Sequence, residues 1–428
     1  MAECPCKPEN DHNRTALLIF VAIFLAFSTV LCIRQLYRQG DLITSDGIGY
    51  FSHLPSILVD GDVDYRNNLE RFGISRRNHW PIGTAISWSG PYLLGYGVSL
   101  VKEGFELQTP QGGHGFPEQL ACCLATIAYG AAAVALTYLL LVRWFEPLPS
   151  LIAVFGLFAG TNLWYYLLCE PYMSHGVSTF WVTVILYLGL RDEALTAKQA
   201  ALIGVAGGMA ALTRPQDGLA LVVPILWHLG QHRNQLRKTL GLLLFSGFLA
   251  VGLFSPQLTI WQAQIAPPSG IVADSTPPAL QGKAENLLHI VPGGGHNWAS
   301  PQFRWALLNL HSGLWTWHPL TALALGGLLL YAARKLRLSL TLLTGYLILL
   351  YMVAAWTGQG QSFGGRMMCS TFAFLATGLA YLCTLFPKTI KVLVIVAALL
   401  NLIVALRYRL LIVEAGGYLK IWEIIGLY

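Results

Sequence analysis

The chain has 428 residues, of which 55% are hydrophobic and only 11% are charged, and its mean hydropathy is +0.55. This composition excludes a set of soluble domains and predicts one all-α polytopic membrane protein. The formal net charge of +6 does not indicate a nucleic-acid partner, because the basic residues fall in short loops between apolar runs, where membrane topology explains them. The eight cysteines have neither zinc nor disulfide spacing.

The chain begins with a polar segment, residues 1–14, that we expect to be a cytoplasmic tail. The apolar run 15–33 that follows is long enough to cross a hydrocarbon core of roughly 30 Å. The leader is acidic and poor in basic residues, which argues against a cleaved signal peptide. The first run is therefore predicted to stay in the membrane, with membrane lipids as partners.

The longest polar region, residues 38–117, follows this span and is predicted to be the first outer loop and the catalytic one. It opens with four aspartates, which is unusual where so few residues are charged: Asp46, Asp60, Asp62 and Asp64. Turn residues surround the last three, and we interpret these as part of a solvated loop. Asp46 is the functional candidate, because it stands where the loop begins.

The second half of this loop, residues 79–100, is amphiphilic and is interrupted by Pro81 and Pro91. The pattern predicts helices that lie in the membrane interface, with Trp80, Trp88 and Tyr92 at headgroup depth. We therefore expect this part of the loop to roof a cavity in the membrane.

Ten more apolar runs follow, and with the first they predict about eleven transmembrane helices. They cover residues 119–142, 149–168, 176–190, 199–213, 217–230, 239–262, 319–333, 338–356, 367–386 and 390–406. Alternate connections carry the basic residues Arg143; Arg191 and Lys198; Arg233, Arg237 and Lys238; Arg334, Lys335 and Arg337; and Lys388 and Lys391. Because Lys and Arg gather in cytoplasmic loops, this alternation predicts a cytoplasmic N-terminus.

The remaining loops, predicted to be outer, carry the unusual polar residues. Glu170 and His175 share one of them, and a second holds Thr213-Arg214-Pro215-Gln216-Asp217. A long segment, residues 263–318, contains Pro-Pro and Gly-rich turns and is expected to act as a lid-like loop over the site. Residues 408–428 are expected to form an outer C-terminal tail.

Two arginines at helix ends on this predicted outer face, Arg214 and Arg366, are candidate ligands for the phosphate of a lipid-linked donor. Arg suits this role because its charge is permanent and its planar donors bind phosphate in pairs. Interfacial snorkelling is the alternative for each arginine. His175 is a candidate to hydrogen-bond a sugar or phosphate, or else it caps a helix.

No cofactor is predicted. The chain has no G-x-x-x-x-G-K-[ST] motif and no G-x-G-x-x-G motif after a strand, so neither ATP hydrolysis nor a dinucleotide is supported. The histidines lack metal-ligand spacing, so a divalent metal is not supported either. A transferase acting at the outer face needs a donor already attached to a polyprenyl phosphate, because that lipid carries the activated sugar to the membrane surface.

The chemistry of such a transfer needs few protein groups. A phosphate leaving group needs charge neutralisation, which Arg provides, while one carboxylate takes the proton of the attacking acceptor hydroxyl. A glycosidase, which expels a poorer leaving group, usually needs two carboxyl groups. One aspartate with one or two arginines is therefore sufficient.

At this point the chain resembles the GT-C superfamily of integral membrane glycosyltransferases, such as protein O-mannosyltransferases and the aminoarabinose transferases of lipid A. The resemblance covers nearly the whole chain and rests on Asp46-Gly47-x-Gly49-Tyr50, Asp60-Gly61-Asp62, His79-Trp80-Pro81-Ile82-Gly83, Thr213-Arg214-Pro215-Gln216 and Ser362-Phe363-Gly364-Gly365-Arg366. It implies an inverting enzyme with Asp46 as general base and a polyprenyl-phosphate sugar as donor. The chain departs from members with paired acidic residues, since Gly47 follows Asp46, and it lacks the large periplasmic domain of some relatives.

These sequence features and the resemblance together predict an enzyme in a bacterial inner (plasma) membrane with its active site on the periplasmic face. Its acceptor is expected to be a glycolipid, with a lipid-linked glycan or a protein side chain as open alternatives. The predicted substrate-binding residues are Tyr50, His79, Trp80, Glu170, His175, Gln216 and Asp217. A transporter or flippase of a lipid-linked glycan is the competing hypothesis, and a non-catalytic assembly subunit is the third. A transporter is less favoured because the polar residues cluster at one face and no internal repeat is visible.

Overall fold

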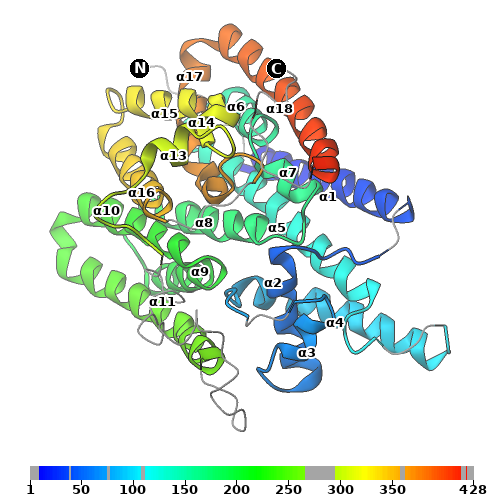
Figure 1. The fold of residues 1–428 in the computed structure, drawn as a ribbon. Helices are drawn as coiled ribbons and strands as arrows, with labels where there is room; N and C mark the ends of the chain where they lie inside the picture. Colours follow the sequence, from blue (N-terminus) through cyan, green and yellow to red (C-terminus); the bar gives the residue numbers. More distant parts are fainter. Residues whose placement is uncertain are drawn as a thin grey trace.

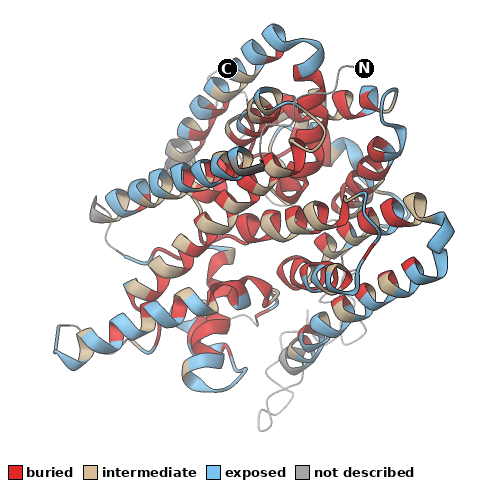
Figure 2. Ribbon diagram, turned by 180° about the vertical axis from the view of Figure 1, so that it is seen from behind, coloured by how far each residue is buried: buried red, intermediate tan, exposed pale blue. Residues whose placement is uncertain are grey.

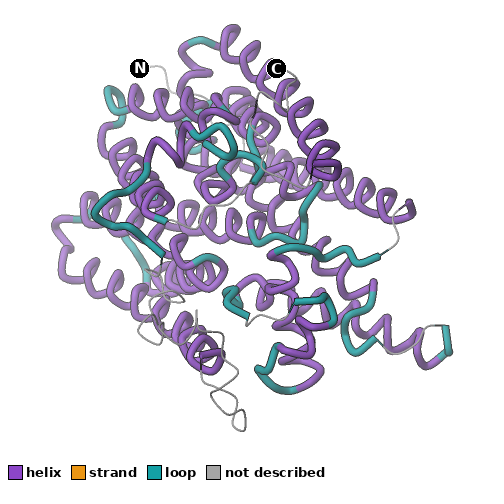
Figure 3. The backbone as a smooth tube through the Cα atoms, viewed as in Figure 1, coloured by secondary structure: helices purple, strands orange, loops and turns teal. Residues whose placement is uncertain are grey.

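The computed structural model describes residues 9–37, 40–74, 78–107, 111–265, 295–356, 362–415 and 421. Within these ranges the chain consists of helices joined by turns and loops, and the one β-contact is an isolated bridge between His296 and Trp356 (Figures 1 and 3). The prediction of an all-α fold is confirmed.

The first half of the chain forms a long helix, a group of short helices in the first loop, and then the centre of the bundle. These elements are α1 (Glu9–Tyr37), α2 (Asp46–Pro55), the π-helical turn η1 (Ser56–Asp60), α3 (Arg66–Glu70), α4 (Gly83–Gly104), α5 (Phe116–Leu141), α6 (Pro147–Gly160), α7 (Leu163–Leu168), α8 (His175–Gly189) and α9 (Ala197–Thr213). In Figure 1, α2, α3 and α4 lie together below α8.

The second half completes the bundle with helices that return repeatedly to α8 and α9. These are the 3₁₀ turn η2 (Pro215–Leu221), α10 (Val222–Gln231), η3 (Arg233–Gln235), α11 (Leu236–Ile265), α13 (Phe303–Leu308), α14 (Leu314–Trp317), α15 (Pro319–Tyr331), α16 (Leu336–Ala355), η6 (Arg366–Thr371), α17 (Phe372–Leu385) and α18 (Pro387–Ala415). The most extensive packing is between α9 and α11, α15 and α17, and α5 and α8.

Among the described residues, six helices are long and apolar enough to cross a membrane. They comprise residues 11–35, 116–141, 233–262, 336–355, 366–385 and 387–409. Three shorter apolar helices are α6, α8 and α15. The membrane character predicted from composition is therefore supported, whereas the count of about eleven spans stays a prediction.

Three of the long helices carry much of the apolar surface. Only 22% of the most hydropathic part of α1, α11 and α18 is buried, against 83% for the segment that contains α17. Figure 2 shows the same contrast, with long pale-blue helices around a red interior. Because soluble proteins rarely expose such continuous apolar faces, we expect α1, α11 and α18 to contact lipid and α17 to form the centre.

The loops rich in Lys and Arg lie together at one end of the bundle, here named the basic end. Arg143, after α5, donates from Nη1 to the carbonyl of Tyr187 near the end of α8 (2.9 Å). At the end of α10, the Gln231 amide donates to Asp192 (3.0 Å) and accepts a hydrogen bond from Arg337 at the start of α16. Loops predicted to share one side of the membrane are therefore neighbours in space.

The loops with the unusual polar residues lie at the other end, here named the polar end. Arg34 at the end of α1 donates to the carbonyl of Cys169 (3.1 Å). The indole of Trp261 near the end of α11 donates to the carbonyl of His79 (3.2 Å). The first loop, the loop after α7 and the end of α11 thus converge, although they are far apart in sequence.

Pro91 does not interrupt the interfacial region as predicted, because α4 runs unbroken through it for 22 residues. A proline inside a helix leaves the carbonyl four residues earlier without its partner, here that of Ser87. The Tyr129 hydroxyl donates to this carbonyl instead (3.2 Å). A contact from α5 therefore compensates for the proline, which the local sequence cannot reveal.

Other predicted boundaries also shift. The apolar run 149–168 is two helices, because the chain breaks between α6 and α7 at Thr161 and Asn162. The last helix continues to Ala415, so the first part of the predicted C-terminal tail is helical, and α1 begins at Glu9 within the predicted N-terminal tail. Residues 266–294, most of the predicted lid-like loop, lie outside the described residues.

Candidate functional site

The first element of the site is the N-terminus of α2, where Asp46 is the first helical residue. Two glycines on α2 let other segments approach closely. A side chain at Gly47 would place its Cβ 2.7 Å from Cδ2 of Tyr172, and one at Gly49 would come 2.1 Å from Cε3 of Trp80. The spacing Asp-Gly-x-Gly is therefore explained by packing, which holds α2 against the turn after α7 and against Trp80.

Trp80 and His79 are part of this support. The Trp80 backbone N–H donates to Asn78, whose amide donates to the carbonyl of Gly49 (2.9 Å). The His79 ring stacks on the Trp80 ring, with centroids 3.9 Å apart. The Trp80 side chain is buried while His79 is exposed, so of this predicted substrate-binding pair only His79 presents its side chain to the surroundings.

The second element is the loop before η6, which ends at Arg366. Gly364 and Gly365 both adopt positive φ values, +25° and +56°. The Gly365 N–H donates to the carbonyl of Ser312 (2.6 Å), and the Asn162 amide donates to the carbonyl of Gly364 (2.5 Å). The break between α6 and α7 therefore supplies the side chain that holds the arginine loop.

Asp46 and Arg366 form an ion pair, with Oδ2 of Asp46 and Nη1 of Arg366 3.3 Å apart. The two side chains are 31% and 21% exposed, so the pair is partly buried and still accessible. The predicted general base and a predicted phosphate ligand are thus in contact, although they are 320 positions apart in the sequence. Arg366 is also close enough to Glu170, Tyr50 and Tyr166 to interact with them electrostatically.

We expect Gly365→Ala to disturb this site more than the matched variant Gly112→Ala. Both glycines have φ of +56°, where an L-residue costs about 1–2 kcal/mol. A Cβ at Gly365 would also lie 2.7 Å from Leu314 Cδ1, whereas one at Gly112 meets nothing within 4 Å. Thermal unfolding of the purified variants should show the larger loss for Gly365→Ala; equal losses would mean that Leu314 yields and that the close packing does not hold the loop.

Arg214, the second predicted phosphate ligand, lies deeper and is 6% exposed. Its Nη1 lies 2.5 Å from Nδ1 of His175, and its Nη2 lies 2.6 Å from the sulfur of Met367. With the amide of Gln216 oriented so that its oxygen faces the guanidinium, that oxygen accepts from Nε (3.1 Å) and Nη2 (3.2 Å). The surrounding protein therefore engages all three nitrogens of Arg214.

The contact with Arg214 defines the state of His175. Because a guanidinium only donates, Nδ1 must accept, which places the imidazole proton on Nε2. Nε2 is buried and has no hydrogen-bond partner among the described residues. His175 thus offers one unused N–H donor beside the arginines.

Two further predicted residues, Asp217 and Tyr50, are buried. Both carboxylate oxygens of Asp217 accept from serine hydroxyls, one from Ser178 and one from Ser370 (2.8 Å for Ser370). The Tyr50 hydroxyl accepts from Ser174 (3.2 Å). Asp217 joins α8, η2 and η6, so its contacts favour a positioning role over the direct substrate binding that was predicted.

Glu170 completes the polar end and has a partner that the sequence did not indicate. Its Oε1 lies 3.8 Å from Nη1 of Arg409 on α18 and accepts from the hydroxyl of Tyr165 (3.1 Å). Arg409 falls in the region predicted as an outer tail. Because α18 continues through this region, Arg409 lies next to Glu170. The sequence could have indicated this contact only if the last helix had been predicted to extend beyond its apolar run.

We expect Glu170→Gln to remove part of the pH dependence of stability. Burial raises the pKa of Glu170 above its usual 4.5, and Arg409 and Tyr165 offset part of the rise. The stability from protonated Glu170 is then fully present below about pH 4.5 and is lost as the pH rises through the folded-state pKa. The unfolding midpoint of Glu170→Gln relative to that of wild type should therefore increase as the pH rises above about 4.5. Two parallel curves would contradict this.

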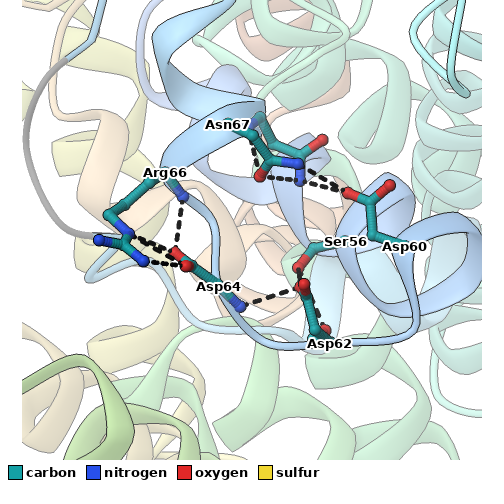
Figure 4. A network of polar contacts seen from close by, with 7 residues as sticks. Ser56, Asp60, Asp62, Asp64, Arg66 and Asn67 are labelled. Atoms are coloured by element: carbon teal, nitrogen blue, oxygen red, sulfur yellow. Dashed lines mark hydrogen bonds and ion pairs between the residues drawn. The ribbon is translucent and has the colours of Figure 1, made fainter. Parts of the chain in front are cut away.

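The other three aspartates of the first loop do not reach the site residues through any described contact. Figure 4 shows that they bind their own neighbours: Asp60 accepts from Asn67, Asp62 from Ser56, and Asp64 pairs with Arg66. All three aspartates are exposed. These contacts agree with the interpretation of a solvated loop.

Comparison of the chain with protein-family models, curated proteins and solved structures finds no match. Within the described ranges there is also no group of three or more His, Cys, Asp or Glu residues arranged to hold a metal ion. Function must therefore be argued from the contacts of the polar end.

Proposed function

We propose that this chain is an inverting membrane glycosyltransferase of the GT-C type, which moves a sugar from a polyprenyl-phosphate donor to a hydroxyl of a glycolipid. The observation that carries the proposal is the ion pair between Asp46 and Arg366, because it sets a carboxylate beside a fixed cation where the polar loops meet. These are the two groups that the transfer needs.

In the proposed reaction the acceptor oxygen attacks the anomeric carbon of the donor, and its proton passes to Asp46. The bond between that carbon and the phosphate oxygen breaks, and polyprenyl phosphate leaves with the electron pair. Arg366 stabilises the charge that develops on the phosphate. A guanidinium has five N–H donors and the contact with Asp46 uses one nitrogen, so donors remain for the phosphate.

The second arginine, Arg214, is proposed to stabilise the donor phosphate electrostatically from a deeper position, without touching it. Its guanidinium is buried and bound by His175 and Gln216. This favours a role in which its positive charge acts on the phosphate at a distance over one in which it touches the phosphate. His175 is proposed to hold Arg214 in this position, since its Nδ1 accepts a hydrogen bond from the guanidinium. Tyr50 and Glu170 are proposed to line the substrate site, since both interact electrostatically with Arg366.

The proposed topology has about eleven crossings, a cytoplasmic N-terminus and the polar end on the periplasmic side of a bacterial inner membrane. The three shorter apolar helices, α6, α8 and α15, support a count above six. The gathering of the basic loops at one end supports the orientation, because such loops remain in the cytoplasm.

Deleting the gene in its host and comparing lipopolysaccharide, lipid-linked saccharides and surface glycoproteins by mass spectrometry tests the proposal. We expect one hexose or pentose to be missing from a glycolipid, and to be restored by the wild-type gene but not by Asp46→Asn. Unchanged glycans with a lipid-linked precursor trapped on the cytoplasmic leaflet would favour the flippase. Restoration by Asp46→Asn would exclude Asp46 as the base, and would leave another carboxylate or a non-catalytic subunit as the explanation.

A further inference from the structure

The basic end contains an open cavity of about 420 Å³ where α10 turns into α11. Its lining includes two arginines, Arg233 and Arg337, together with Gln231, His232 and Asn234. None of the described residues that line it is acidic. From this cavity and its surroundings we infer a binding site for the phosphate group of an anionic phospholipid, independent of the proposed sugar transfer.

The lining has more hydrogen-bond donors than the protein itself is seen to use. His232 contributes a buried Nε2 that has no hydrogen-bond partner among the described residues. Arg337 reaches over Gly230, its Cδ and Nε each lying 3.4 Å from where a Cβ would be, and gives one hydrogen bond to Gln231. The Gln231 amide also donates to a carboxylate oxygen of Asp192 (3.0 Å), and Asp192 does not line the cavity. Two guanidinium groups can therefore face one anion, and the His232 ring lies in the same lining.

The start of α11 strengthens this inference. Backbone N–H groups at a helix N-terminus favour negative charge, and acidic residues are the usual complement there. The first turn of α11 contains no acidic residue and holds Arg237 and Lys238 instead. Positive side chains at the positive end of this 30-residue helix are unfavourable, and an anion bound nearby would offset the cost.

The surface next to the cavity favours a lipid over a soluble phosphate. Leu236, Leu240, Leu244 and Phe248 are spaced four residues apart along α11, which places them on one face, and they are 50%, 45%, 65% and 75% exposed. This apolar strip begins at the residue that follows η3, directly beside the cavity. A phospholipid with its phosphate in the cavity would lay an acyl chain along the strip.

The cavity is well separated from the candidate active site. Arg337 stands at the start of α16, whereas Val353, near its other end, lines a small cavity together with Arg366. A helix of 20 residues is about 30 Å long, close to the thickness of the hydrocarbon core. The inferred lipid site therefore belongs to the opposite membrane surface, where basic pockets between helices bind lipid headgroups.

The test is lipid binding by the purified full chain, measured as the rise in unfolding temperature on titration with phosphatidylglycerol, phosphatidylcholine or inorganic phosphate. We expect phosphatidylglycerol to bind wild type more tightly than phosphatidylcholine, and Arg233→Gln/Arg337→Gln to weaken it at least about tenfold. The control Arg334→Gln/Lys335→Gln removes two exposed charges from the same end that do not line the cavity, and should change the affinity less than about twofold.

Equal losses in the two double variants would overturn the site, because the attraction would then come from diffuse surface charge. Equal binding of the two phospholipids would overturn it as well. Saturation by inorganic phosphate at the same concentration as the lipid would overturn the assignment to a lipid in favour of a soluble phosphate. None of these measurements uses sugar transfer, so their outcome does not depend on whether the proposed enzyme activity is correct.

Discussion

Asp46→Asn should reduce sugar transfer by roughly 10²-fold or more while leaving the donor bound, as expected for loss of a general base. Asparagine has almost the same shape and retains an oxygen for Arg366, but it cannot take the proton of the acceptor hydroxyl. The measurement is turnover by the purified variant in proteoliposomes, together with direct binding of the polyprenyl-phosphate sugar.

The matched control for this variant is Asp62→Asn. Asp62 lies in the same loop and accepts a hydrogen bond from Ser56 (2.9 Å), which an asparagine oxygen can still accept. Turnover should therefore stay within about twofold of wild type, as for an exposed residue away from the site. If Asp46→Asn turned over normally, the base would have to be sought among Asp60, Asp62 and Glu170, and loss of turnover in both variants would indicate a general effect on the loop.

The class of fold and the loops that form the polar end could be predicted from the sequence, because both depend on local patterns. Apolar runs predict helices, and the alternation of basic loops predicts which connections lie at the same end. That alternation linked the loops of Glu170, Arg214 and Arg366 with the first loop, and the structure brings all four together. Asp46 and Arg366 are now in contact, although nothing in the sequence related one to the other.

What sequence reasoning missed depends on contacts between distant segments. The glycines after Asp46 are explained only by Trp80 and Tyr172 packing against α2. Arg409 could not be assigned because the last apolar run ends before the helix does. Asp217 was predicted to bind substrate, and only the positions of two serine hydroxyls reveal that its carboxylate is engaged inside the protein. Hydropathy and charge report none of these distances.

The contacts of Arg366 and Arg214 indicate different roles for the two arginines. Arg366 is 21% exposed at its side chain and is paired through one nitrogen with Asp46, whereas Arg214 is buried and held on all three nitrogens. Removing Arg366 should therefore affect the donor phosphate directly. Removing Arg214 should also free His175 and Gln216, and thus combine a loss of activity with a loss of stability.

Arg366→Ala should lower kcat/KM for the donor by about 10²-fold or more, because a preorganised donor to the developing phosphate charge is lost. Arg366→Lys keeps the charge but loses the planar pair of donors, so its loss should be smaller, about tenfold. Arg71→Ala is the control, since Arg71 is an exposed arginine of the first loop whose guanidinium binds Gln111 (2.8 Å), and it should change little. Kinetics with varied donor concentration decide the matter: if Arg366→Ala and Arg214→Ala both kept the wild-type KM and turnover, the donor phosphate would bind elsewhere.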